Sequence, residues 1–316
     1  MAVYLTSPAG VATGGTELLH QFAAAMSDNG VECYMIYPDR KKDVDPVPER
    51  FKKYNVKVAP NYPDKEDSFL VLAETQVHFA RECVKGRLMI WWLSVDFYRM
   101  AYESEIKERG IDAFNLKEKT NVIHRVQSFY AGEFLKNEMG IEEYDFLGDY
   151  IGDEIIDFAL KYSHQVEKKN YCIYNPKKGY EYIKPLMDAC KKEITWVPLQ
   201  NLTPFEMAGL MSLSKVYVDF GMHPGMDRIP REAAACRALV LTNKKGSAAN
   251  DIDVPIPDRF KIEDYQNVEG VLEVIYEMLD DYENLKQLYE PYREIIFGQK
   301  EKFIEDVKKL VETIMI

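Results

Sequence analysis

The segment from Val216 to Ala249 constrains the fold of this chain more than any other. It reads in order as a short apolar strand, a loop punctuated by glycine and proline, a helix of small residues, a second apolar strand and a turn. A strand–helix–strand unit of this kind indicates parallel strands in an α/β sheet. Such sheets bind ligands at the carboxyl ends of their strands. We therefore expect a binding site in the loops that follow Phe220 and Thr242.

The same alternation of strands and helices extends along the chain. In the first half, strands are predicted at residues 2–6, 31–37, 56–59, 68–73, 87–93 and 121–127. In the second half they are predicted at 171–174, 194–198, 216–220 and 238–242, with helices at 179–190, 204–213 and 230–236, and only helical patterns follow residue 262. A chain of 316 residues is long enough for two such domains. The sequence predicts two doubly wound, Rossmann-like α/β domains facing a cleft, with an N-terminal domain over 1–152, a polar hinge over 153–169 and a C-terminal domain over 170–298.

Composition narrows the class of protein. A formal net charge of −12, with no basic tail or stripe, argues against a protein that binds nucleic acid. The five cysteines are scattered and form no C-x-x-C pair, which is typical of a cytoplasmic protein without disulfides or a zinc cage. No H-E-x-x-H or H-x-H pattern occurs, so no metal is expected. The longest apolar run, 88–93, is too short to cross a bilayer, which leaves peripheral membrane contact open.

The loop after the first predicted strand is rich in small residues and leads into a helix. Gly14 and Gly15 would let the backbone approach a phosphate, which the N–H groups at the helix N-terminus would bind. The alternative is an ordinary turn in which Thr16 caps the helix. The dinucleotide fingerprint G-x-G-x-x-G is missing, although Asp39 follows the second strand where a ribose-binding acid would lie. Phosphate binding is the interpretation we favour.

The loop after the first strand of the second domain carries two lysines. Asn175 is followed by Lys177 and Lys178, and Gly179 then leads into a predicted helix. A lysine at the mouth of a strand and the start of a helix can neutralise a diphosphate. The alternative is a solvated turn lysine. Lys178 lies closer than Lys177 to the start of the predicted helix, which makes Lys178 the stronger candidate.

Cationic residues gather around the helix predicted at 230–236 in this otherwise acidic chain. They are Arg228, Arg231, Arg237, Lys244 and Lys245. An anionic ligand such as a nucleoside diphosphate is the simplest reason for them. Pro230 suits a first helical turn, which would place Glu232 near the helix N-terminus, where its carboxylate could accept two ribose hydroxyls. An acid is also favoured there without a ligand, and Arg228 and Arg231 either hold phosphate or pair with Asp227 and Glu232.

Other polar residues are weaker candidates. Ser94 and Asp96 leave a strand at its carboxyl end, next to a tryptophan pair that we expect in the core. His223 lies in the loop after 216–220, whereas His20 on the first helix is expected at the surface or partly buried. Ser247 lies in the turn after 238–242.

Taken together, these loops and the two-domain order resemble a GT-B glycosyltransferase, of the retaining kind related to family 4 and common in bacterial surface-polysaccharide synthesis. The Gly14-Gly15 pair matches the family's Gly-Gly loop, which approaches the donor phosphates. The Lys178-Gly179 pair matches the Lys-Gly that binds the donor diphosphate, with Asn175 about where the family has arginine.

The resemblance continues into the segment that starts at Glu232 and is similar to the family's E-A-x-A-x-G-x-P-V-V, whose glutamate binds the donor ribose. The family has a second glutamate eight residues earlier, near the sugar, where this chain has Pro224. Asp219, His223 or Asp227 could take its place, or backbone N–H groups at Gly225 and Met226 could bind the sugar.

The resemblance implies a metal-independent, retaining transferase that needs no cofactor. It would move a sugar from a nucleotide-diphosphate donor, most simply UDP-linked, to a saccharide or lipid-linked acceptor. The C-terminal domain would bind the donor, the N-terminal domain the acceptor, and a helix at 299–316 would pack back on the N-terminal domain. The oligomeric state is not indicated. The implied catalytic residues are Lys178, Asp227 and Arg228, and the implied substrate-binding residues are Gly14, Gly15, Asp96, Asn175, His223, Gly225, Arg231, Glu232 and Ser247.

Three other functions are compatible with the sequence. A nucleotide-sugar epimerase of the same fold would convert its donor without an acceptor. A catalytically silent protein would bind the nucleotide sugar and neither transfer nor hydrolyse it, which Pro224 makes a serious alternative. A dinucleotide-dependent oxidoreductase is the weakest, because the glycine fingerprint is missing.

Overall fold

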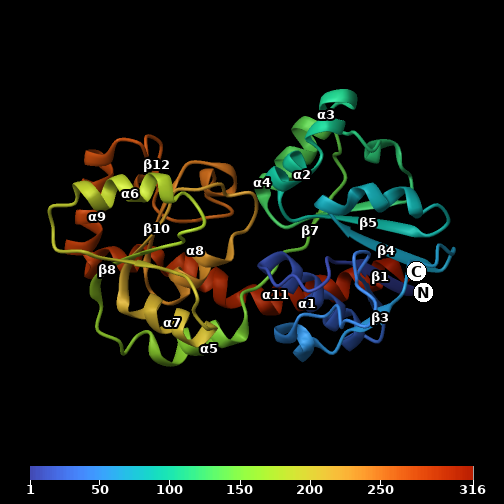
Figure 1. Cartoon of the computed structure of the whole chain (residues 1–316), viewed down its shortest axis with the longest axis horizontal. Helices are drawn as coiled ribbons and strands as arrows, with labels where there is room; N and C mark the ends of the chain where they lie inside the picture. Colours follow the sequence, from blue (N-terminus) through green and yellow to red (C-terminus); the bar gives the residue numbers. More distant parts are fainter. Residues whose placement is uncertain (316) are drawn as a thin grey trace. The chain divides into compact units, whose positions relative to one another are not determined.

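The computed structural model describes residues 1–315 and divides the chain into two compact units, each with its own parallel sheet (Figure 1). The N-terminal unit contains residues 1–149 together with the chain from Glu301 onward. The C-terminal unit contains residues 150–300. The predicted α/β class with two Rossmann-like domains is confirmed.

The N-terminal sheet has seven strands in the order β3-β2-β1-β4-β5-β6-β7. They are β1 (Ala2–Thr6), β2 (Glu32–Ile36), β3 (Lys57–Ala59), β4 (Ser68–Ala73), β5 (Arg87–Trp92), β6 (Val122–Val126) and β7 (Asp145–Phe146). The neighbouring strands pair in parallel. The first six follow the Rossmann order, which reverses direction between β1 and β4. Loops at the carboxyl ends of those two strands are therefore the expected ligand-binding region of this unit.

The C-terminal sheet has five strands in the order β12-β11-β10-β8-β9. They are β8 (Lys169–Tyr174), β9 (Thr195–Pro198), β10 (Ser214–Asp219), β11 (Leu239–Asn243) and β12 (Lys261–Ile262). All of these pairs are also parallel. Numbered within the unit, this is the flavodoxin-like order 2-1-3-4-5, which reverses between β8 and β10.

Helices connect the strands of both units. Those of the N-terminal unit are α1 (Gly14–Asp28), η1 (Glu49–Tyr54), η2 (Glu74–Glu82), α2 (Val95–Ala101), α3 (Glu103–Arg109), η3 (Leu116–Glu118), α4 (Phe129–Phe134) and the π-helical turn η4 (Leu135–Met139). Those from residue 150 onward are α5 (Asp153–Tyr162), α6 (Tyr180–Ala189), α7 (Pro204–Leu213), α8 (Arg228–Ala235), η5 (Gly246–Ala249), η6 (Asp258–Phe260), α9 (Val268–Asp280), α10 (Tyr282–Leu285), η7 (Lys286–Tyr289) and α11 (Glu290–Ile314).

The predicted strands are all present, each ending within two residues of its predicted bounds. They were recognisable because strands of a covered parallel sheet are apolar on both faces, as in β4, where every residue is buried. The tryptophan pair at the end of β5, Trp91 and Trp92, is fully buried, as expected of core residues.

Several elements differ from the prediction. The segment predicted as a hinge, 153–169, contains α5 and the first residue of β8, both in the C-terminal unit. The last helix begins at Glu290 instead of 299. The two-residue strands β7 and β12 had no recognisable pattern because two residues are too few to show a period of two.

The second residue after α8 adopts a conformation that is unfavourable for a residue with a β-carbon. Arg237 has φ of +65°, in the left-handed region where helices usually place glycine. Replacing Arg237 by glycine should raise the free energy of unfolding by about 1 kcal/mol, since the strain on the β-carbon is removed. Urea unfolding followed by circular dichroism measures the change.

The matched control for this prediction is Arg237→Ala. It removes the same guanidinium, which lies 3.6 Å from Glu290 in a partly exposed ion pair of small expected value, but it keeps the β-carbon. If glycine and alanine at this position give equal stability, backbone strain is not the cause.

Candidate functional site

Charged side chains gather where the order of the C-terminal sheet reverses. Lys178 lies in the loop between β8 and α6, Asp219 is the last residue of β10, and His223 and Asp227 lie in the loop between β10 and α8. We call these four residues the Lys178 cluster. The fold alone makes this edge of the sheet the expected ligand-binding region.

The ammonium group of Lys178 contacts the other three members. Its Nζ donates to Asp227 Oδ2 at 2.7 Å and to Asp219 Oδ2 at 3.0 Å, and it lies 3.3 Å from His223 Nδ1. The hydroxyl of Tyr217, on β10, donates to Asp219 Oδ2 at 2.8 Å. The cation is thus held by two carboxylates, one of which is fixed by a buried tyrosine.

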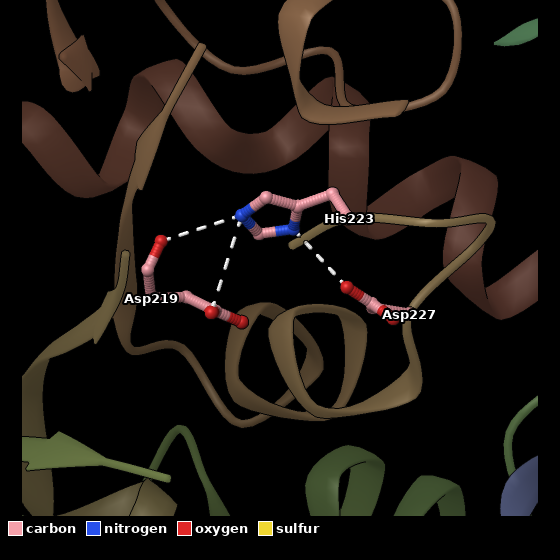
Figure 2. A group of neighbouring side chains, drawn as sticks. All are labelled: Asp219, His223 and Asp227. Atoms are coloured by element: carbon pink, nitrogen blue, oxygen red, sulfur yellow. Dashed lines mark hydrogen bonds and ion pairs between the residues drawn. The ribbon is translucent and has the colours of Figure 1, made fainter. Parts of the chain in front are cut away.

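The imidazole of His223 lies between the two aspartates (Figure 2). Its Nδ1 is 3.1 Å from Asp227 Oδ2, and its Nε2 is 3.4 Å from the backbone oxygen of Asp219. One nitrogen cannot both donate to Asp227 and accept from Lys178. The protonation state of the ring therefore decides which of these two contacts is a hydrogen bond.

The electrostatic environment favours the charged forms of Lys178 and Asp227. Burial alone would lower the pKa of Lys178, but the charges of Asp219 and Asp227 outweigh it, and the pKa lies above its usual value. Burial alone would raise the pKa of Asp227, but His223 and Lys178 outweigh it, and this pKa lies below its usual value. Both shifts stabilise the ion pair at neutral pH.

Glycine residues allow the two loops of the cluster to approach each other. Gly179 has φ of +69°, and a β-carbon there would lie 2.3 Å from the carbonyl oxygen of Phe220. A β-carbon on Gly221 would lie 2.3 Å from Cγ of Lys178. The glycine of the Lys178-Gly179 pair therefore has a structural reason, which is the close contact between the two loops.

A third loop, after β11, is fastened to the same region. The hydroxyl of Ser247 donates to the Gly225 oxygen at 2.6 Å, and its backbone N–H donates to the His223 oxygen at 2.8 Å. Ser247 is fully buried. Ser247 and Gly225 join the two loops to each other, and their predicted role in substrate binding stays a prediction.

The residues around the start of α8 divide into two kinds. Arg231 is buried and donates to the backbone oxygens of Asp227 and Met226 and to Gln299 Oε1, so it positions the loop. Arg228 is the first residue of the helix and is half-buried. Glu232 lies in the second helical turn, which corrects the prediction that it lies near the N-terminus. The reason is that α8 starts two residues before Pro230.

A small cavity adjoins the cluster. It has a volume of about 10 Å³ and is lined in part by His223, Asp227, Thr242 and Ser247. That volume admits one water molecule and excludes a nucleotide. A larger ligand must therefore contact the cluster from its exposed side, where about 20% of the Lys178 side chain is accessible.

Gly14, Gly15 and Asp39 are candidate residues of the N-terminal unit. Gly14 and Gly15 are the first two residues of α1, but the N-cap is Thr13, with Thr16 completing a capping box, which corrects the assignment of Thr16 as the cap. Asp39 accepts from the backbone N–H of Ala9 at 2.9 Å and so fixes the loop after β1.

Asp96 and His20 also belong to this unit. Asp96 lies in the first turn of α2 and accepts from the Tyr130 hydroxyl at 3.1 Å. His20, expected at the surface or partly buried, is instead fully buried, with its ring nitrogens 2.6 Å from the Thr16 oxygen and 2.8 Å from the Tyr37 hydroxyl.

The remaining candidate of the C-terminal unit, Asn175, shapes the lysine loop. Its side-chain oxygen accepts from the Lys177 backbone N–H at 3.0 Å, and its backbone oxygen accepts from the Lys178 N–H at 3.2 Å. This turn directs Lys178 towards β10, whereas Lys177 is exposed.

Sequence reasoning missed two buried polar residues. Tyr217 supports the cluster, and its strand position looks like an ordinary core tyrosine in the sequence. Glu74 follows β4 at the reversal point of the N-terminal sheet, where it accepts from the Leu93 backbone N–H at 2.9 Å. Burial raises the pKa of Glu74 to about 7. A strand end beside the reversal point was the signal that would have found it.

Solved structures share this fold over nearly the whole chain. Sucrose-phosphate synthase from Thermosynechococcus elongatus has a TM-score of 0.66 at 13% sequence identity, covering 99% of each chain. Anabaena HepE, solved with UDP-glucose, has a TM-score of 0.67 at 11% identity, covering 99% of this chain and 100% of HepE. An α-glucosyltransferase solved with UDP and a 13-mer DNA has a TM-score of 0.56 at 13% identity. The match covers 98% of this chain and 99% of the glucosyltransferase.

These neighbours are GT-B glycosyltransferases, so the fold predicted from the resemblance is confirmed. At such low identity the likeness shows the fold alone. No protein-family model matches the sequence, and no curated protein matches it. Among the described helices, none is both long and apolar enough to cross a membrane.

Proposed function

We propose that this chain is a glycosyltransferase that uses a nucleotide-diphosphate sugar, most simply a UDP-sugar, as its donor. The observation that carries the proposal is the position of the Lys178 cluster. A partly exposed cation lies at the carboxyl ends of β8 and β10, where a sheet of this order binds ligands. The structural neighbours solved with UDP or UDP-glucose support the choice of donor.

The proposed reaction needs a stabilised leaving diphosphate and a stabilised sugar with oxocarbenium character. Lys178 and Arg228 would face the diphosphate, and fixed cations of this kind act without a metal or another cofactor. Asp227 would lie near the cationic sugar, and Glu232 would bind the ribose. We propose transfer with retention, the acceptor entering on the face that the diphosphate leaves, because this route needs no protein nucleophile.

The N-terminal unit is proposed to bind the acceptor, a saccharide or a lipid-linked saccharide, in the cytoplasm. Gly14 and Gly15, at the start of α1, would close over the donor phosphates, and Asp96, at the start of α2, would contact substrate. Both helices follow strands whose carboxyl ends lie at the same edge of the sheet. Gly15 is exposed, and no atom outside its own helical turn and its chain neighbours lies within 4 Å of a β-carbon position, so a ligand could approach the backbone there.

A silent nucleotide-sugar-binding protein and an epimerase are the alternatives. Pro224 stands where the resembling family has a glutamate, and the missing carboxylate favours the silent protein. Product analysis separates the three: an epimerase converts the donor alone, a transferase needs an acceptor, and a silent protein changes neither.

Nucleotide binding tests the proposal before any acceptor is known. We expect UDP to raise the midpoint of thermal unfolding, because a ligand that binds only the folded state at a hundredfold excess over Kd adds about 2.7 kcal/mol. The panel is UDP, GDP, ADP, CMP and NAD. Glu232→Ala should lose the UDP shift, and Glu273→Ala, which removes an exposed glutamate of α9, should keep it. A shift with NAD alone, or with no nucleotide, contradicts the proposal.

A further inference from the structure

The Lys178 ammonium stands at the centre of a set of metal-ligand atoms. Asp219, His223 and Asp227 offer two carboxylate oxygens and one imidazole nitrogen, and these atoms all lie within 4.8 Å of one another. The ammonium nitrogen is within 3.3 Å of each of the three side chains. A cation on a flexible stem therefore occupies the position that a metal ion would take.

The three residues are of the types that bind zinc. Zinc takes imidazole nitrogen at about 2.0–2.1 Å and carboxylate oxygen at about 2.0–2.2 Å, and three protein ligands with one open position are typical of its catalytic sites. His223 Nδ1 and Asp227 Oδ2, 3.1 Å apart, are already at about the separation of two ligands on one tetrahedral ion. If Nδ1 bound the ion, Nε2–H would still face the Asp219 backbone oxygen, which would fix the ring.

The third ligand, Asp219, is buried and incompletely satisfied. Its side chain is about 1% exposed, and its Oδ1 accepts no hydrogen bond from residues 1–315. This oxygen lies 3.0 Å from Lys178 Nζ and 4.0 Å from His223 Nε2. The Tyr217 hydroxyl binds the other oxygen and leaves Oδ1 directed into the cluster. A buried carboxylate oxygen whose only contact is an ion pair can coordinate a divalent cation.

We propose that Asp219, His223 and Asp227 form a divalent-cation site that Lys178 keeps closed. The ammonium supplies the positive charge that the two carboxylates need, and it excludes zinc because both cannot occupy the same space. Gly221 makes this possible, since a β-carbon there would collide with the lysine stem. Removing the ammonium group by substitution opens the site.

The test compares metal binding by the natural chain and by Lys178→Met, which keeps a long unbranched side chain without the charge. At pH 7.5, calorimetric titration with Zn²⁺ should give one equivalent bound by the variant at least about 100-fold more tightly than by the natural chain, because a unit charge a few ångströms away is removed. Co²⁺ in place of Zn²⁺ should give the visible absorption of a tetrahedral nitrogen–oxygen site. No nucleotide is present, so the outcome is independent of the proposed transferase activity.

Control variants locate the binding. Lys177→Met removes a neighbouring exposed lysine and should leave zinc binding unchanged from the natural chain. Lys178→Met combined with His223→Gln should lose the new site, because one of three ligands is gone. Circular dichroism should also show that Zn²⁺ raises the unfolding temperature of Lys178→Met and not that of the double variant.

Two results would overturn the proposal. One is zinc binding by the natural chain as tight as by Lys178→Met and abolished by His223→Gln, since the ammonium would then be no barrier. The other is no zinc binding by Lys178→Met. If that variant does not fold with or without zinc, Lys178→Gln decides the question by the same titration.

Discussion

Replacing Lys178 by alanine is expected to lower the turnover of sugar transfer by a factor of about 100. That is the scale of losing one preorganised charge contact to a developing anion. The pKa of Lys178 lies above its usual value, so its ammonium is charged, and about 20% of its side chain is exposed. Steady-state kinetics with a UDP-sugar and an acceptor found by product analysis measure the loss.

Stability must be separated from chemistry in this experiment. Removing Lys178 leaves the buried Asp219 carboxylate without its cation, and breaking a buried pair costs about 3–5 kcal/mol. Turnover is therefore measured below the unfolding transition of the variant, checked by circular dichroism. Lys177→Ala, an exposed lysine of the same loop, should retain full turnover. Full turnover in folded Lys178→Ala would remove this lysine from the mechanism.

Replacing Gly179 by alanine should destabilise the C-terminal unit by about 3 kcal/mol or more. The backbone there has φ of +69°, and the new β-carbon would lie 2.3 Å from the Phe220 carbonyl oxygen, which is backbone and cannot rotate away. A strained conformation alone costs about 1–3 kcal/mol, and the collision adds to it. Urea unfolding followed by tryptophan fluorescence and circular dichroism measures the change.

Gly209→Ala is the matched control for this change. Gly209 lies inside α7 of the same unit, and a β-carbon there would meet only the Phe158 ring at 3.8 Å. Alanine should stabilise the helix by about 0.5–1 kcal/mol. If Gly179→Ala and the natural chain have equal free energies of unfolding, the two loops can separate at no cost in stability. The close contact would then not stabilise the unit.

The sheets could be predicted from the sequence because their strands are buried on both faces. Runs such as 68–73 are apolar throughout and are bounded by polar loops, so even their ends were nearly right. Helix starts were harder to predict. Two threonines, Thr13 and Thr16, both suit an N-cap, and only the backbone shows that Thr13 is the cap. The same uncertainty of one turn moved Glu232 from the first turn of α8 to the second.

The candidate site was predictable in its loops and unpredictable in its contacts. Lys178 and Asp227 are far apart in the sequence but follow strands that meet at one edge, so the topology explains why both were chosen. The burial of Arg231 and Ser247 depends on three loops packing on each other, and single-sequence patterns carry no such information. His20 was placed near the surface because a lone histidine on a helix does not reveal its buried partner, Tyr37.

The helix α11 adds the last part of the chain to the N-terminal unit, so that unit lacks some of its residues until synthesis is nearly finished. The ribosome makes the seven strands of the N-terminal unit first, but that unit also includes the chain from Glu301 onward. Four apolar side chains of this late segment are buried: Phe303, Val307, Leu310 and Ile314. The C-terminal unit, contained within 150–300, is synthesised in full before they emerge. The core of the N-terminal unit can therefore be completed only after the whole C-terminal unit has been synthesised.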